Sequence, residues 1–197
     1  IPDIRHRDVP SLDVLGTILG EGRSSRLFRR VREQLGVVHS VDAWTYSPGN
    51  PGLIGISGVA DGDKGVASCE SILSEVERAK EEGFVEEEIE KAKKIFLAGT
   101  LGAKKTMQGQ AQDLGGSWMA AHDLGFSGRY LDRVKQLSLD DIQRVAQEYL
   151  IEPNRTLAGL LPAGSKAKTT NKVELHQQNP IELQPLSNGL RLLPKED

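Results

Sequence analysis

The chain is poor in the residue types that build a metal centre or a disulfide. Its 197 residues include one cysteine, Cys69, so no disulfide can form within the chain. The four histidines, His6, His39, His122 and His176, lie too far apart for a local ligand pair, and neither His-Glu-x-x-His nor its inverted form occurs. A Gly-x-Ser-x-Gly nucleophile motif is also missing. The sequence therefore predicts no metal ligand and no cofactor-binding residue of its own.

Long apolar runs and an excess of positive charge are missing too. No apolar stretch approaches the roughly 20 residues that span a bilayer, and no signal peptide opens the sequence. With 25 Lys and Arg against 28 Asp and Glu, the net charge of -3 argues against nucleic acid or an anionic membrane as the main partner. The composition predicts a soluble protein. The sequence does not fix the compartment, and the bacterial periplasm or cytoplasm is expected. The opening residues resemble a domain interior, so a targeting segment could precede them.

Apolar periodicity predicts two helices followed by a hairpin. Residues 8–19 have apolar side chains at helical spacing, with Asp8 as the N-cap. A second helix is expected to begin with Ser24 or Ser25 as its cap and to end at Gly36. Residues 37–46 and 52–60 are rich in valine, isoleucine and aromatic residues and flank a turn of Pro, Gly and Asn, which predicts an antiparallel hairpin.

A block of helices and one closing strand follow. Helices are predicted from residue 63 to Gly83, from residue 85 through a weak or bent region between residues 99 and 116, over 127–136 and over 138–150. The stretch Ser138-x-x-Asp141 resembles a capping box at the start of the last helix. Residues 155–161 are predicted to form a short closing strand. Segregated helices and an antiparallel hairpin indicate an α+β fold in which helices cover the sheet, in the order αα-ββ-αααα-β.

Composition divides the chain into three parts. Residues 1–163 carry the predicted helices and strands and form the main domain. Residues 164–180 are polar and are expected to form a linker. Residues 181–197 turn apolar again around the turn sequence Ser187-Asn188-Gly189, which predicts the first strands of a further module that the sequence does not complete.

Two further features of the sequence have a plain and a functional interpretation. The arginines at positions 23, 26, 29, 30 and 32 concentrate positive charge after a glycine-rich loop, and they form either a solvated helix face or a surface for an acidic partner. Cys69 lies on the predicted buried stripe of its helix, which favours a packed thiol over a nucleophile.

Around the glycine-rich loop the sequence resembles the C-terminal half-module of the pitrilysin/insulinase zinc peptidases, which include mitochondrial processing peptidase. The resemblance rests on Leu19-Gly20-Glu21-Gly22-Arg23-Ser24-Ser25-Arg26-Leu27-Phe28-Arg29-Arg30-Val31-Arg32-Glu33 and on the helix starts Gly83-Phe84-Val85-Glu86 and Leu137-Ser138-Leu139-Asp140. It covers roughly residues 1–163, and Leu186 to Leu193 resembles the first strand of the next module.

The resemblance implies a peptidase whose zinc is held by a different half-module, through an inverted His-x-x-Glu-His helix and a later glutamate. It also implies that the half opposite the zinc supplies an arginine and, seven residues later, a tyrosine, which bind substrate and steady the oxyanion. Arg32 matches the arginine, whereas His39 occupies the tyrosine position. Strand alternation places His39 on one face with Val37, Val41 and Ala43 and favours a structural role. These two positions are the candidate site residues.

Two functions remain open at this point. In the first, the chain is a non-catalytic domain of a zinc metallopeptidase: it helps to enclose peptides, packs against a zinc-bearing half-module of the same or a partner chain, and is inactive alone. In the second, it is an interaction module of the same fold without peptidase activity, similar to the core subunits of respiratory complexes. Zinc is expected only in the full-length protein. The resemblance also allows a dimer, and a zinc motif upstream would favour the peptidase.

Overall fold

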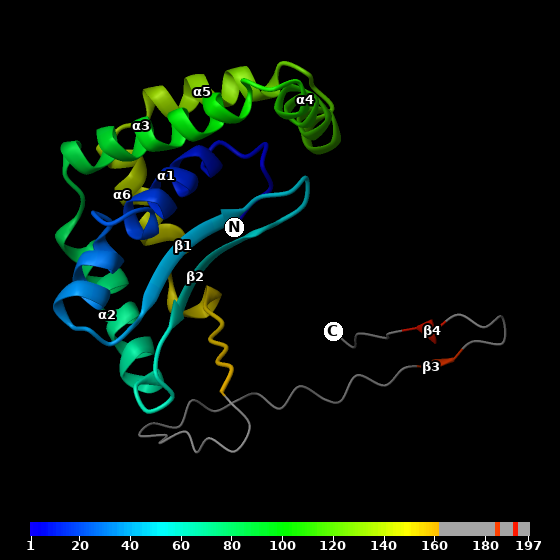
Figure 1. Ribbon diagram of the computed structural model, residues 1–197. Helices are drawn as coiled ribbons and strands as arrows, with labels where there is room; N and C mark the ends of the chain where they lie inside the picture. The colour runs from blue at the N-terminus through cyan, green and yellow to red at the C-terminus, as the bar shows by residue number, and fades with distance from the viewer. Residues whose placement is uncertain (162–183, 186–190, 193–197) are drawn as a thin grey trace.

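The computed structural model describes residues 1–161, 184–185 and 191–192, which form an α+β arrangement in which helices pack on one side of an antiparallel hairpin (Figure 1). The elements of the main body are α1 (Val9–Gly20), the π-helix η1 (Phe28–Gln34), β1 (Ser40–Tyr46), β2 (Leu53–Val59), α2 (Gly65–Glu82), α3 (Glu86–Ala103), α4 (Met107–Ala121), α5 (Phe126–Gln136), α6 (Leu139–Tyr149) and the 3₁₀ turn η2 (Glu152–Asn154). The predicted fold class is confirmed.

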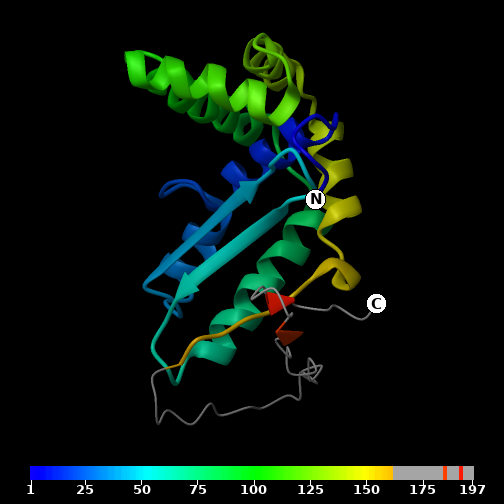
Figure 2. The ribbon, with the colours of Figure 1, turned by 90° about the vertical axis from the view of Figure 1, so that its right-hand side faces the viewer.

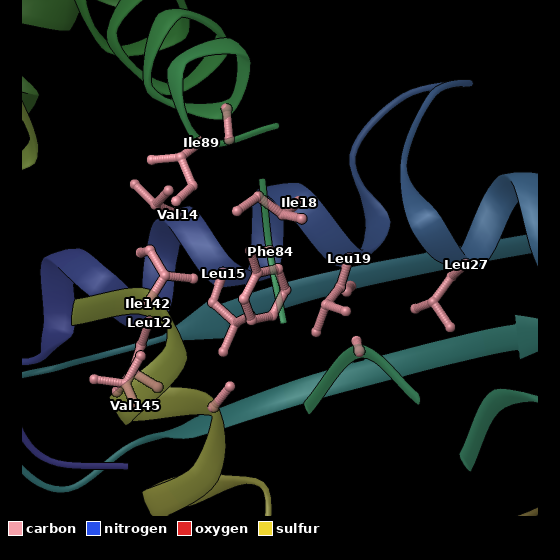
Figure 3. Close-up of a cluster of buried hydrophobic side chains, with 14 of the residues drawn as sticks. Leu12, Val14, Leu15, Ile18, Leu19, Leu27, Phe84, Ile89, Ile142 and Val145 are labelled. Carbon is pink, nitrogen blue, oxygen red and sulfur yellow. The ribbon is translucent and has the colours of Figure 1, made fainter. Parts of the chain in front are cut away.

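Helix α1 is the centre of the core. Nearly all of its residues are buried, because its apolar side chains point to several neighbours rather than to one face. It packs against β1 on one side and against α3, α5 and α6 on others. In the close-up of the core, side chains of α1 such as Leu15 and Ile18 lie between Ile89 of α3, Phe84 and Ile142 of α6 (Figure 3). This helix therefore ties the sheet to the helical layer.

The hairpin forms as the sequence predicts, with a short turn joining two strands. β1 and β2 pair antiparallel from Ser40 opposite Val59 to Tyr46 opposite Leu53. On β1, Val41 and Ala43 are buried against the helices, while Trp44 and Tyr46 point outward. The alternation that half-buried strands require is therefore present in β1, and one face of the sheet stays uncovered.

The weak helical region predicted between residues 99 and 116 is a break between two helices. α3 ends at Ala103, and Thr106 begins α4 by accepting a hydrogen bond from the Gly109 backbone N–H to its Oγ1 at 3.0 Å. A side chain at Gly109 would collide with the Ala103 carbonyl, so the tight corner depends on this glycine. The main body thus has five α-helices after the hairpin, where the sequence predicted four.

The predicted closing strand is wrong for the described residues. After η2, residues 155–161 are extended but pair with no strand in the part of the chain that the structure describes. Leu157, Leu160 and Leu161 are exposed there. A short apolar segment of this kind suits a strand, but a strand needs a partner edge, and the sequence pattern alone does not identify that edge.

Two smaller predictions are also corrected. Asp8 occupies the N-cap position of α1, but its carboxylate makes no cap and instead accepts hydrogen bonds from Arg144 at 2.6 Å and Tyr149 at 2.9 Å. Cys69 is half-buried rather than packed in the core. The capping box at Ser138 and Asp141 is confirmed, with reciprocal bonds of 3.2 and 2.9 Å.

The expected linker and most of the expected next module lie outside the described residues. Two short segments there are described: β3 (Gln184–Pro185) and β4 (Arg191–Leu192) pair antiparallel on either side of the predicted turn. The division of the chain into a half-module, a linker and a further module remains a prediction. None of the helices in the described residues combines the length and the apolar character needed to cross a bilayer.

Candidate functional site

Arg32 is held at the end of the π-helix, close to the start of β1. Its Nε donates a hydrogen bond to the backbone carbonyl of His39 at 2.7 Å. Its guanidinium carbon lies 4.5 Å from the centre of the Phe28 ring, which is within the range of a cation–π interaction. Phe28 and Arg32 are four residues apart in η1 and therefore lie on the same side of it. The sequence-predicted residues Arg32 and His39 are therefore brought into direct contact.

His39 lies immediately before β1, and its side chain points away from the core. The predicted common face with Val41 and Ala43 is wrong, because the regular strand begins only at Ser40. The His39 backbone N–H does bond to the Val59 carbonyl at 2.7 Å, which anchors the residue to the end of β2. The side chain is 63% exposed. It is therefore available to a ligand, which the alternation argument did not predict.

Asp61 is the residue of this site that the sequence did not reveal. The His39 Nε2 lies 3.0 Å from the Asp61 Oδ1, and Lys64 Nζ lies 3.4 Å from the other carboxylate oxygen. The hydrogen bond from His39, followed by that from Lys64, lowers the pKa of the Asp61 carboxyl below its usual range. The hairpin register contained the signal, because pairing Ser40 with Val59 brings the residues just outside both strand ends together.

The site can bind a polar, extended ligand. Arg32 is exposed, and its hydrogen bond to the His39 carbonyl uses only Nε. Within the described residues, its two terminal nitrogens make no other hydrogen bond and can donate to a ligand. Donors of this kind suit carbonyl or carboxylate oxygens. Four polar side chains form this corner: Arg32, His39, Asp61 and Lys64. The corner has no apolar walls of its own.

Next to this corner, the outer face of the hairpin carries large apolar side chains. Trp44 is 44% exposed and Tyr46 is 60% exposed, and Leu53 and Val59 on β2 are also exposed. The Trp44 ring lies flat across Gly55, where a side chain would be within 2.6 Å of the ring atoms. Figure 2 shows the two strands side by side, with the helices gathered on the other sides of the hairpin. The sheet therefore presents an apolar face that runs from Val59 at the open end, near His39, to Trp44, Tyr46 and Leu53 toward the turn.

The arginine cluster that the sequence singled out divides into two groups. Arg26 is largely covered: it makes a two-pronged ion pair with Glu88 at 2.9 and 2.7 Å and lies over the Phe84 ring. It therefore fastens the loop to α3. Arg29 and Arg30 are exposed. The Ser25 hydroxyl is buried without a hydrogen-bond partner in the described part of the chain, so the predicted cap at this position is wrong.

The described residues contain no group of side chains that could form a zinc site. No group of three or more His, Cys, Asp or Glu side chains within these residues is arranged to hold a metal ion. The Arg32 corner offers two side chains of zinc-ligand type, His39 and Asp61, with the cations Arg32 and Lys64 beside them, so it does not fit a zinc ion either. No chemical step is therefore assigned to a metal bound by these residues.

Comparisons with known proteins find domains of similar sequence and fold among the zinc peptidases. Residues 1–96 match the family model of the Peptidase M16 inactive domain. The match includes α1, the π-helix, the hairpin and both candidate residues. The resemblance to the C-terminal half-module of these zinc peptidases is thereby confirmed, as is the interpretation of the chain as a non-catalytic domain of this kind.

Individual relatives point the same way. The chain is 28% identical over 146 residues to an uncharacterized zinc protease of Streptomyces coelicolor, a match that covers 71% of this chain and 30% of that protein. It is 26% identical to the structure called the "Inactive Peptidase Domain of a Putative Zinc Protease" from Bordetella parapertussis, with a TM-score of 0.71 over 79% of this chain and 85% of that one. The chain thus spans about a third of the length of the Streptomyces relative.

Proposed function

We propose that this chain is the non-catalytic half of a zinc peptidase, which packs against a zinc-bearing half-module and supplies part of the wall that encloses a peptide. The single observation that carries the proposal is the direct contact of Arg32 with the His39 backbone at 2.7 Å, at the place where the family's substrate-binding pair is expected. The zinc ion would be held by the other half-module, where it would activate water for peptide hydrolysis.

The outer face of the hairpin supports the same function. Trp44, Tyr46 and Leu53 form an exposed apolar surface, which on an isolated globular domain calls for a partner or a ligand. An extended peptide would lay its side chains on this face while Arg32 holds a backbone carbonyl. Aromatic surfaces bind apolar side chains with little loss of their own conformational freedom. The proposed substrate class is therefore unfolded or extended peptide.

We expect replacement of Arg32 by alanine to weaken peptide hydrolysis by the full-length protein that contains this chain. A hydrogen bond from a charged donor contributes about 1.5 to 3 kcal/mol, which corresponds to a fall in kcat/KM of about ten- to a hundredfold. The measurement is cleavage of a quenched fluorescent peptide at saturating zinc. Arg29→Ala is the matched control, because Arg29 is an exposed arginine of the same π-helix outside this corner.

The outcome of that comparison decides between the two functions. Equal loss for both variants would mean that positive charge matters and that Arg32 has no special place. Activity unchanged by Arg32→Ala, and unchanged when residues 1–161 are deleted, would remove the peptidase proposal. The interaction module without peptidase activity would then take its place, with the exposed Arg29 and Arg30 as its surface.

A further inference from the structure

The contact between His39 and Asp61 has a chemical consequence for the proposed substrate site. The two residues lie just outside the same open end of the hairpin, His39 before β1 and Asp61 after β2, and their side chains meet with His39 Nε2 3.0 Å from Asp61 Oδ1. Both side chains are exposed, at 63% and 50%, so the pair lies on the surface and not in the core. A surface His–Asp pair beside a substrate-binding arginine fixes which ring nitrogen faces a ligand.

An ionised carboxylate can only accept hydrogen bonds. Asp61 is therefore the acceptor, and the hydrogen in the contact belongs to His39 Nε2. In a neutral imidazole, the other nitrogen then has no hydrogen and presents a lone pair. Nδ1 of His39 makes no hydrogen bond within the described residues. A ligand would thus meet an acceptor at this position, whereas a tyrosine hydroxyl would offer a donor.

The surrounding charges do not change this assignment. Lys64 approaches the second oxygen of Asp61 at 3.4 Å and leaves the first to His39. The Arg32 guanidinium bonds to the His39 carbonyl and not to its ring. Among the described residues, Arg32 and Lys64 are the charged groups in contact with His39 or Asp61. Arg32 binds the His39 carbonyl oxygen and Lys64 binds Asp61 Oδ2, so neither competes for the contact between the His39 ring and Asp61 Oδ1.

We propose that Asp61 is a positioning residue that holds His39 with its hydrogen on Nε2, so that Nδ1 accepts a backbone N–H from an extended peptide. This inference rests on the proposed function, because it names how the same corner binds its substrate. Arg32 then donates hydrogen bonds to peptide carbonyl oxygens, and His39 Nδ1 accepts one from a peptide N–H. An imidazole at this position, in place of the tyrosine phenol, presents a hydrogen-bond acceptor instead of a donor. This suits a half-module that binds peptide but does not stabilise an oxyanion.

The first test uses nitrogen NMR of the histidine rings in the 197-residue chain, at a pH where the His39 ring is neutral. The His39 signals are assigned by their loss in His39→Gln. We expect Nε2 to show the shift of a protonated ring nitrogen and Nδ1 that of an unprotonated one. In Asp61→Ala the two shifts should move toward each other as both tautomers become populated. Asp63→Ala, in the same loop, is the control and should leave both shifts unchanged.

The second test measures peptide cleavage by the full-length protein. Loss of one hydrogen bond of about 0.5 to 1.5 kcal/mol should raise KM about two- to tenfold and leave kcat unchanged, because the contact is equally strong in substrate and transition state. Asp61→Ala and His39→Ala should show this rise, and the double variant should show no more than His39→Ala alone, since Asp61 acts through His39. Asp63→Ala, the control used above, should leave KM unchanged.

The two tests separate the inference from the proposed function. A protonated Nδ1 in the wild-type chain, or shifts that Asp61→Ala does not alter, would overturn the inference whatever the full-length protein does. Correct tautomers together with an unchanged KM in both alanine variants would also overturn it, because the lone pair would then bind no substrate. Failure of the full-length protein to cleave any peptide would instead count against the proposed function.

Discussion

Replacement of Gly20 by alanine is expected to lower the free energy of unfolding by about 3 kcal/mol or more. Gly20 is the last residue of α1 and lies directly against β1. A methyl group there would lie 2.5 Å from the Ala43 Cβ and 2.7 Å from its Cα. Since backbone atoms of a paired strand cannot move aside alone, α1 would have to shift from the sheet and open the core beside it.

Gly16→Ala is the matched control for this prediction. Gly16 lies one turn earlier in the same helix, and a methyl group there would meet only the Thr45 Cγ2, at 3.6 Å. Because alanine favours helix over glycine by about 1 kcal/mol, this variant should be as stable as the wild type or slightly more stable. Urea denaturation followed by circular dichroism gives both values. Equal destabilisation of the two variants would show that the close approach at Gly20 does not hold α1 to β1.

Leu15→Ala is expected to have an effect of similar size. The Leu15 side chain is completely buried, and in Figure 3 it lies in the core between α1 and the neighbouring elements. Removal of three buried carbons should cost about 3 kcal/mol, made up of lost burial and an unfilled cavity. For a chain of this length that corresponds to a fall in the melting temperature of about 6 to 12 °C.

Leu160→Ala provides the comparison. Leu160 is the same residue type but is fully exposed in the extended segment after η2. Its replacement should change the melting temperature by less than about 2 °C, as most exposed substitutions do. If Leu160→Ala destabilised the chain as much as Leu15→Ala, residues 155–161 would have to be buried in solution, and the predicted closing strand would regain support.

Local patterns predicted the elements whose partners lie nearby in sequence. The hairpin followed from two β-branched runs around a Pro and Gly turn, and the start of α6 followed from the Ser138 and Asp141 spacing. Each depends on contacts between residues a few positions apart, or on a register that a short turn fixes. Arg32 and His39, which do meet, were identified by the resemblance to the zinc peptidases and not by a local pattern.

The features that local patterns missed all depend on distant partners. Asp13 is half-buried in α1 and accepts hydrogen bonds from the hydroxyls of Thr45 in β1 and Tyr130 in α5, and the desolvation of its carboxyl raises the pKa of that group. Nothing in the neighbourhood of Asp13 indicates those partners. Asp61 was missed for the same reason, since it lies 22 residues from His39. The side-chain direction of His39 was predicted wrongly because alternation fails outside the paired strand.

The most direct test of the non-catalytic assignment is a parallel measurement of zinc content and peptide cleavage on the purified 197-residue chain. After dialysis against trace zinc, mass spectrometry of the metal should find no stoichiometric zinc, and a quenched fluorescent peptide should stay intact. One zinc ion per chain that is lost when any two of the four histidines are replaced, together with cleavage that a chelator stops, would contradict the assignment.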